Sequence, residues 1–193
     1  MAHIIGERIR LRAAEKSEIN LFLTWINDPE VTENLTLIYP MSQFEEDRWY
    51  EHMMSLPPAE HVMVIDIQDE GQPGGYRPIG TTQFHNLDWR CRSAEVGILI
   101  GEKTLWNQGY GTETMKLMLK HGFESLNLHR IWLQVYAKNK RGIRAYEKVG
   151  YQFEGQFREA HYQHGQYFDV HFMSVLRPEW LLNQKLQQNE GSN

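Results

Sequence analysis

The sequence predicts one domain built around a single mixed α/β sheet that is covered by helices. Its 193 residues are enough for one well-packed domain and few for two. Hydrophobic residues make up 41% of the chain and charged residues 23%, which is ordinary for a globular protein. Patterns typical of strands and helices follow one another as strand, two helices, three strands, then helix, strand, helix and further strands.

The N-terminal part of the chain predicts a strand and two helices. The segment "RIRLR" (8–12) alternates charged and apolar residues, which is the period of a half-buried strand. Ser17 is placed to cap a helix over 19–26, and this helix is expected to stop at Asp28, which precedes a proline. Residues 30–42 predict an irregular loop, after which "SQFEEDRWYEHMMS" predicts a second short helix.

The rest of the chain predicts strands interrupted by helices. "HVMVIDI" (61–67) and "IGTTQFHNL" flank a segment rich in turn residues and predict a hairpin, whereas the more continuously apolar "SAEVGILI" (93–100) predicts a central strand. A later strand, a helix and two more strands are expected near 130–137, 140–149, 151–157 and 167–176. The domain is expected to span 1–180, because 181–193 ends without an apolar pattern and should fray.

The segment "WNQGYGTETMKLMLKHG" (106–122) places two glycines one residue apart at the start of a helix. The helix is indicated by apolar residues at helical spacing, namely Met115, Met118, Leu119, Gly122 and Leu126. A helix N-terminus has unsatisfied N–H groups and a partial positive charge, and glycines let those groups converge on a phosphate. A pyrophosphate therefore fits this chemistry. The alternative is that Gly109 and Gly111 only form a tight turn.

Two better-known phosphate-binding loops are excluded here. A dinucleotide fingerprint needs a third glycine where Thr114 stands, and "GEKT" (101–104) lacks the Gly-Lys-Ser/Thr order of a P-loop.

A second group of polar residues lies in "VYAKNKRGIRAYEKVGY" (135–151). Asn139 stands where a helix would be capped, and Gly150 fits the position just after its end. Tyr146 lies on this helix beside a run of basic residues that includes Arg144 and Lys148. Taken alone, the pattern also fits a partly buried tyrosine on a basic, solvated helix.

The two segments together, in this order and spacing, resemble the GNAT acetyltransferase superfamily. In that family a motif of the form Gln/Arg-x-x-Gly-x-Gly/Ala binds the pyrophosphate of acetyl-coenzyme A. The motif here is Trp106-Asn107-Gln108-Gly109-Tyr110-Gly111, and its initial Trp is similar to the branch that holds ribosomal-protein-alanine and spermidine acetyltransferases. The resemblance covers nearly the whole chain and implies a GNAT-like acyl-CoA N-acyltransferase fold with a mostly antiparallel sheet.

The resemblance also implies which residues hold acetyl-CoA as co-substrate. The strand from Glu95 would be splayed, so that its backbone contacts pantetheine at Ile98, Leu99 and Ile100. The pyrophosphate would lie on the turn 106–112, and Asn139 would contact the pantetheine arm. The implied cofactor-binding residues are Ile98, Leu99, Ile100, Trp106, Asn107, Gln108, Gly109, Tyr110, Gly111, Thr112, Asn139, Arg144 and Lys148.

Two residues are implied in the chemistry of acetyl transfer to a primary amine by direct attack in a ternary complex. Tyr146 occupies the family position of the general acid, because a neutral tyrosine can protonate the leaving thiolate. Glu95 is the leading candidate for the base, with a structural or orienting role as an equal alternative, and His85 is a weaker candidate.

The acceptor remains open at this stage between a small-molecule amine and a protein N-terminus. Spermidine enzymes carry clustered carboxylates in the first long loop, whereas "ENLTLIYP" here has only Glu33 and Asn34 before apolar residues, which is evidence against a polyamine. A non-catalytic acyl-CoA-binding or regulatory module is the alternative function. An unrelated α/β binding protein, in which neither Gly109 nor Tyr146 matters to a ligand, is a third.

Composition limits the other partners. The net charge of −5 without a basic run argues against nucleic acid, and no apolar run reaches membrane-spanning length. Cys91 stands alone, which excludes an internal disulfide framework, and the spacing of His161, His164 and His171 is a poor match to a zinc site. We therefore expect a soluble, cytoplasmic protein without a metal. A homodimer is expected, since exposed strands of the implied fold often pair between subunits.

Overall fold

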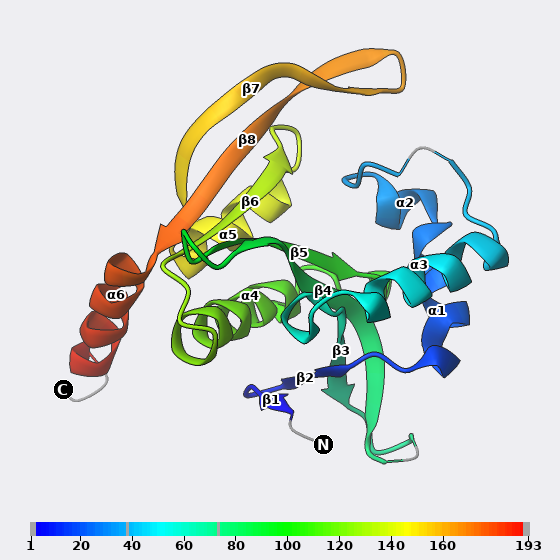
Figure 1. Cartoon of the computed structure of the whole chain (residues 1–193), viewed down its shortest axis with the longest axis horizontal. Helices are drawn as coiled ribbons and strands as arrows, with labels where there is room; N and C mark the ends of the chain where they lie inside the picture. The colour runs from blue at the N-terminus through cyan, green and yellow to red at the C-terminus, as the bar shows by residue number, and fades with distance from the viewer. Residues whose placement is uncertain (1–2, 38, 73, 191–193) are drawn as a thin grey trace. The chain divides into compact units, whose positions relative to one another are not determined.

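The computed structural model describes residues 3–37, 39–72 and 74–190, and in this part of the chain eight strands form one sheet (Figure 1). The strand order is β1-β2-β3-β4-β5-β6-β8-β7. The strands are β1 (Ile4–Ile5), β2 (Ile9–Ala13), β3 (Met63–Gln68), β4 (Tyr76–Asp88), β5 (Ser93–Ile100), β6 (Arg130–Tyr136), β7 (Gln152–Gln163) and β8 (Gln166–Leu176). The β5–β6 pair is parallel, whereas the pairs β1–β2, β2–β3, β3–β4, β6–β8 and β7–β8 are antiparallel. The mixed, mostly antiparallel sheet is confirmed.

The chain divides into two compact units. The first unit comprises the residues up to His85 together with Gly97–Leu117, and the second comprises Asn86–Val96 together with the residues from Met118 onward. The prediction of one domain over 1–180 stays a prediction. The final helix, α6 (Arg177–Glu190), continues to Glu190 through most of the segment predicted to fray, and residues 191–193 lie outside the described part.

The helices of the first unit differ from the prediction at their ends. The helix α1 (Ile19–Ile26) follows a 3₁₀ turn, η1 (Lys16–Glu18), and Ser17 lies inside that turn rather than at a cap, so the predicted cap is wrong. The Glu18 side chain instead accepts a hydrogen bond from the backbone N–H of Glu15 at 2.9 Å, which fixes the entry of the chain.

The segment after α1 contains a helix that was not predicted. Asp28 does end α1, but its side chain also accepts from the N–H of Glu30 at 2.9 Å and caps the short helix α2 (Pro29–Thr32). The irregular loop therefore begins after Thr32 rather than at residue 30. The next helix, α3 (Gln43–Ser55), starts as predicted, with a capping box at Ser42.

The helix α4 (Tyr110–Lys120) follows β5 and a 3₁₀ turn, η3 (Lys103–Leu105), and continues into a π-helical turn, η4 (His121–Ser125). Met115, Met118 and Leu119 are fully buried, so the predicted apolar face of this helix is confirmed. Burial of this face fixes the direction of the helix and hence where its N-terminus points.

The second unit consists of β6, β7 and β8 with α5 (Lys140–Val149) and α6. In Figure 1, β7 and β8 run side by side as a long hairpin. Asn139 caps α5 and Gly150 follows it with φ 105°, a left-handed conformation that favours glycine, so both predicted ends are confirmed. The basic residues of α5 are exposed, whereas Tyr146 on the same helix is half-buried.

Candidate active site

The glycine turn before α4 belongs to the first unit, and two of its side chains bond to carbonyls just before it. Asn107 and Gly109 have φ of 63° and 88°, both left-handed conformations, of which asparagine and glycine are the most tolerant residues. Trp106 Nε1 donates to the Ile100 carbonyl at 2.8 Å, and Gln108 Nε2 donates to the Thr104 carbonyl at 2.8 Å. The tight-turn interpretation therefore accounts fully for Gly109.

Gly111 is different, because nothing in the chain requires a glycine there. Its φ is not left-handed, and a Cβ added to it would meet only Ile100 Cγ1 and Ile98 Cδ1, each at the ordinary contact distance of 3.9 Å. Within a helix glycine is about 1 kcal/mol worse than alanine. The chain would therefore accept a side chain at Gly111, and the glycine leaves this space open.

The backbone around Gly111 has the donors that an anion needs. The first bond of the α4 ladder runs from the Glu113 N–H to the Gly109 carbonyl at 3.0 Å, so the N–H groups of residues 110–112 have no acceptor within the helix. Together with the helix dipole they form an anion site at a half-buried, bare backbone. The residues present fit the pyrophosphate of an acyl-CoA.

The last residues of β5 extend beyond the part of the strand that pairs with β6. Among the described residues the register between β5 and β6 covers Ser93–Glu95, whereas β6 continues to pair with β8 as far as Tyr136. The predicted pantetheine contacts Ile98, Leu99 and Ile100 follow that last pair and are half-buried. On its β4 side, β5 is packed so tightly that a Cβ at Gly80 would lie 2.1 Å from the Leu99 carbonyl oxygen.

In the second unit, α5 carries three of the predicted cofactor-binding residues. The Asn139 side chain accepts from the Gly142 N–H at 2.9 Å, so its Oδ1 atom forms the helix cap. Arg144 and Lys148 are exposed and lie four positions apart, on one face of the helix. The first turn of α5 contains no acidic residue, so basic side chains add to the positive end of the helix dipole.

Tyr146 lies on α5 against a second tyrosine. Its ring centroid is 5.9 Å from that of Tyr151, which is buried and whose hydroxyl has no hydrogen-bond partner among the described residues. Burial raises the pKa of Tyr146 to about 12, a rise that Arg141 opposes, and burial raises the pKa of Tyr151 well above 10. Both phenols are therefore neutral at neutral pH and hold a proton that can be donated.

Glu95 is held by amide side chains of the second unit. Its Oε2 atom accepts from Asn86 Nδ2 at 2.8 Å, and its Oε1 atom accepts from Gln134 Nε2 at 3.5 Å. Two amide donors fix the orientation of this carboxylate, and an oriented carboxylate fits both the predicted base and the structural or orienting role.

His85 belongs to the first unit and lies over a glycine. Gln83 Nε2 is 2.8 Å from its Nδ1 atom, and a Cβ on Gly97 would be 2.8 Å from its Nε2 atom, so this glycine makes room for the imidazole ring. The other polar atom of the Gln83 amide, Oε1, is buried without a partner in the described part of the chain.

The structure brings the predicted residues together in two sets. The first unit holds the turn 106–112 beside Ile98 and Ile100, and the second unit holds Glu95, Asn139, Arg144, Tyr146 and Lys148. Sequence reasoning missed Arg8, Gln83 and Tyr151. Of these, only Tyr151 had a signal in the sequence, because it ends the "AYEKVGY" segment, but no pattern indicated that its hydroxyl would be buried without a partner among the described residues.

The remaining reactive side chains do not form a site. His161 stacks on Tyr136 and His171 packs edge-on against Phe153, and no group of three or more His, Cys, Asp or Glu among the described residues is placed to hold a metal. A hydrogen bond with Asp88 raises the pKa of the exposed Cys91 thiol, which makes it a poorer nucleophile. None of the helices in the described part is long and apolar enough to cross a membrane.

Comparison with known proteins gives matches along most of the chain. A family model described as an acetyltransferase (GNAT) domain matches residues 8–152. An uncharacterized N-acetyltransferase, p20, from Bacillus licheniformis is 28% identical over 182 residues, which is 93% of this chain and 99% of the relative. A protein from Bacillus subtilis (strain 168), YdaF, named as a candidate ribosomal N-acetyltransferase, is 31% identical over 101 residues, or 52% of this chain and 55% of the relative.

A solved structure is similar over nearly the same length. The crystal structure of spermidine N-acetyltransferase from Vibrio cholerae in complex with CoA and spermine has a TM-score of 0.81 and 25% identity to this chain. The similarity covers 91% of this chain and 99% of that one. The predicted fold is therefore confirmed, and with it the predicted relation to a CoA-binding protein.

Proposed function

This chain belongs to the GNAT acetyltransferase family, and from that premise we propose that it acetylates a primary amine by direct attack in a ternary complex. Family membership makes it an acetyl-CoA-dependent N-acetyltransferase.

The observation that carries the proposal is the room at Gly111. The chain would accept a Cβ at this position, yet it has a glycine at the start of α4, where three backbone N–H groups have no acceptor within the helix. A pyrophosphate needs both the donors and the bare backbone. The conformation of the turn explains why residue 109 is a glycine, but it does not explain why residue 111 is one.

Acetyl-CoA, when bound, supplies a thioester carbonyl carbon for attack by the amine and a thiolate that leaves. The backbone of residues 98–100 holds the pantetheine arm, and the turn 106–112 holds the pyrophosphate. Fixing the position of the reacting groups contributes much of the rate, on the order of several kcal/mol. Arg144 and Lys148 offer exposed positive charge to the remaining phosphate.

Tyr146 supplies the proton that the leaving sulfur needs. As the bond between carbonyl carbon and sulfur breaks, the phenolic O–H donates to the thiolate, and solvent then returns the proton to the phenolate. The pKa of Tyr146 is raised to about 12, so the phenol is protonated before each turnover and can hydrogen-bond to the leaving sulfur. A coenzyme thiol has a pKa near that of free Cys, about 8.5, so the thiolate can leave at neutral pH with this hydrogen bond and take its proton from the phenol or from solvent.

The attacking amine must lose a proton as the new C–N bond forms. Glu95 and His85 are the two candidates to accept it, directly or through water. Glu95 already has amide donors on both oxygens, whereas the His85 ring lies within hydrogen-bond distance of Gln83 Nε2. Comparing Glu95→Gln with His85→Ala would separate these two roles.

We propose a weakly charged amine or a peptide N-terminus as the acceptor. The Vibrio cholerae structure holds spermine, but two carboxylates just before the first long loop of this chain are already paired. Lys103 Nζ pairs with Asp28 Oδ2 at 2.7 Å and also with Glu30. Paired carboxylates attract a polycation less than free carboxylates do.

Thiol release from acetyl-CoA tests the proposal. Purified protein is assayed against a panel of polyamines, amino sugars, amino acids and short peptides, with Tyr146→Phe beside the wild type. We expect release with monoamines or peptides that exceeds release with spermidine and falls in the variant. Binding of acetyl-CoA without release for any acceptor would favour a non-catalytic module, and absence of binding would contradict the assignment of the glycine turn.

A further inference from the structure

We propose that Arg8 is a positioning residue for the co-substrate, which holds the glycine turn in place and cancels the charge of Glu113 beside the anion site. The inference rests on the proposed binding of the pyrophosphate at the start of α4. It concerns the first unit alone, where Arg8 and the turn both lie.

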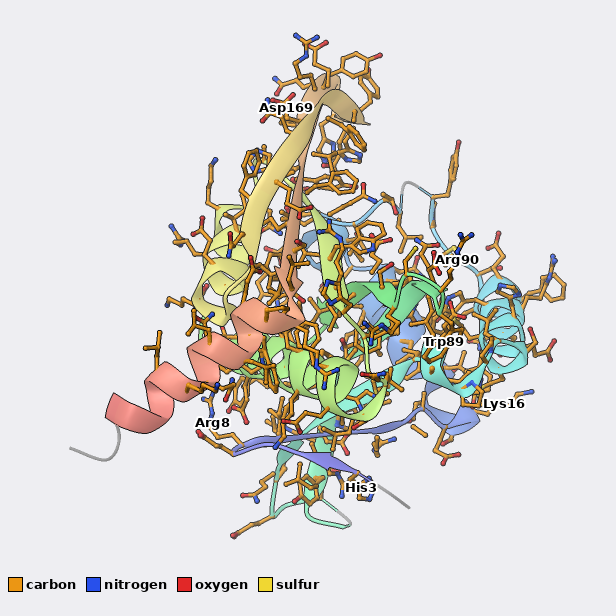
Figure 2. The ribbon with its side chains drawn as sticks, turned by 60° about the vertical axis from the view of Figure 1, so that its left-hand side comes forward. His3, Arg8, Lys16, Trp89, Arg90 and Asp169 are labelled. Atoms are coloured by element: carbon orange, nitrogen blue, oxygen red, sulfur yellow. The ribbon has the colours of Figure 1, made fainter. Side chains whose placement is uncertain are left out.

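Arg8 reaches the turn from the N-terminal end of β2. Figure 2 shows Arg8 at this end and Lys16 beyond the other end of the strand. The Arg8 Nη1 atom donates to the Gln108 carbonyl at 3.0 Å, and the guanidinium carbon lies 4.6 Å from the centroid of the Tyr110 ring. One side chain therefore contacts the residues on both sides of Gly109.

Glu113, in the first turn of α4, is bound to Arg8 at two points. Its Oε1 atom accepts from the Arg8 backbone N–H at 2.8 Å, and its Oε2 atom accepts from Arg8 Nε at 3.0 Å. The Glu113 side chain is only 13% exposed, against 48% for Arg8, so the ion pair is partly shielded from solvent. Such a two-point contact fixes orientation as well as charge.

Gly6 completes this arrangement. It lies in the turn between β1 and β2, where its N–H donates to the Ile9 carbonyl at 2.8 Å. A Cβ at Gly6 would lie 2.7 Å from Glu113 Oε1 and 3.1 Å from Leu117 Cδ1. The glycine in the N-terminal turn therefore leaves room for the Glu113 carboxylate. This fit indicates that the contact between Arg8 and Glu113 is part of the fold and differs from an incidental ion pair at the surface.

The charge balance explains why an arginine is needed. A carboxylate in the first turn of a helix stabilises the helix, but it occupies the same positive end that a phosphate would use. Without Arg8, the Glu113 carboxylate would repel the pyrophosphate. Solvent and salt would screen this repulsion little, because the Glu113 side chain is mostly shielded from solvent. With Arg8 in place the carboxylate anchors α4, and the N–H groups of residues 110–112 remain available for the ligand.

Two ligands, one with and one without the pyrophosphate, separate this positioning role from an effect of Arg8 on the stability of the protein. CoA carries the pyrophosphate, whereas S-acetylpantetheine has the same pantetheine arm and no phosphate. We expect Arg8→Met to weaken CoA binding by about ten-fold, measured by isothermal titration calorimetry, and to leave S-acetylpantetheine binding, measured by NMR titration, within about two-fold.

Two further variants separate the effect of the Arg8 charge from the effect of its forked hydrogen bonds. Arg8→Lys keeps the charge but loses the forked contact, so we expect an intermediate loss of about three-fold. In the double variant Arg8→Met/Glu113→Gln the repelling charge is gone, and we expect CoA affinity to recover to within about three-fold of the wild type. Arg90→Met, which removes an exposed arginine from the loop after β4, is the matched control and should bind CoA normally.

The outcomes distinguish the inference from the function on which it rests. Wild-type protein that does not bind CoA would overturn both. Wild-type binding with an unchanged affinity in Arg8→Met, an equal loss for S-acetylpantetheine, or no recovery in the double variant would overturn the inference alone. Melting temperatures are measured for every variant. If Arg8→Met does not fold, the CoA affinity of Arg8→Lys tests the inference instead. Normal CoA binding by Arg8→Lys would contradict the role of the forked contact.

Discussion

At the scale of single residues, Gly109 and Gly111 are separated by one position but are glycines for different reasons. Gly109 has φ 88°, which disfavours any side chain, whereas Gly111 has helical backbone and room for a Cβ. The first is required by the fold of the turn. The second is the glycine that we propose a ligand requires, and substitution by alanine can separate the two requirements.

Gly111→Ala is expected to bind CoA at least about ten-fold more weakly while its free energy of unfolding stays the same or rises by up to about 1 kcal/mol, since alanine favours the helix. Gly109→Ala should instead lose about 1–2 kcal/mol of stability, because its φ is left-handed. Urea unfolding and calorimetric titration with CoA measure both quantities. Normal CoA binding by Gly111→Ala would remove the main support for the anion site.

The Tyr146 phenol is expected to stay protonated over the whole working range. Its pKa is raised to about 12, so ionisation begins well above the range in which an ordinary tyrosine loses its proton, about pH 10. An alkylamine acceptor loses its proton near the same ordinary value. The rate, as kcat/KM, should therefore rise from about pH 7 to about pH 10 without a descending limb from Tyr146.

The check is the pH profile of the wild type beside that of Tyr146→Phe, which should be lower by about ten- to a thousand-fold in kcat with a similar KM for acetyl-CoA. A descending limb between about pH 8 and 9 that disappears in the variant would show that the tyrosine ionises early and that its pKa is not raised.

At the scale of elements, strongly periodic helices were predictable and helix ends were less so. The buried face of α4, with Met115 and Met118, follows from apolar spacing alone. Ser17 does not cap α1, because Glu15 and Glu18 form a reciprocal contact that only the folded turn reveals. Asp28 before a proline signals a stop, but the same pair also caps and starts α2.

The site was predictable where its residues are close together in the sequence. The turn around Gly109 and the cap at Asn139 each lie within one local pattern. The contact between Arg8 and Glu113 joins residues 105 positions apart, and the Gln83 Oε1 atom, which has no partner among the described residues, is visible only when β4 is packed. No spacing rule indicates such contacts, because they depend on how the elements fold together.

The helix α5 separates the structural role of Asn139 from its predicted contact with pantetheine. Its Oδ1 atom is used by the cap, so a ligand contact has to use Nδ2. Asn139→Asp retains the cap and removes this donor, so its stability should match the wild type while the KM for acetyl-CoA rises about three- to ten-fold. Asn139→Ala should also lose about 1 kcal/mol of stability.

Thermal unfolding and steady-state kinetics on the two Asn139 variants provide the measurement. If Asn139→Asp keeps both its stability and its KM, then Asn139 serves the fold of α5 alone and the predicted contact with pantetheine is wrong.

At the scale of the whole molecule, the account requires that both substrates are bound when the acetyl group moves. No residue of the described site is placed as an acyl carrier, and Asp88 holds the Cys91 thiol at a raised pKa. Intact protein incubated with acetyl-CoA and no acceptor should therefore show no added acetyl mass. A stoichiometric acetyl adduct that an amine then removes would contradict direct transfer, and Cys91→Ser would test that residue as its site.

The central claim is that the start of α4 binds the pyrophosphate of the co-substrate. The most direct measurement is an NMR titration of isotope-labelled protein that follows the backbone amides of Tyr110, Gly111 and Thr112. With CoA these resonances should shift in proportion to occupancy, and with S-acetylpantetheine they should stay in place while amides of β5 respond. Binding of CoA that leaves these three amides unshifted would contradict the claim.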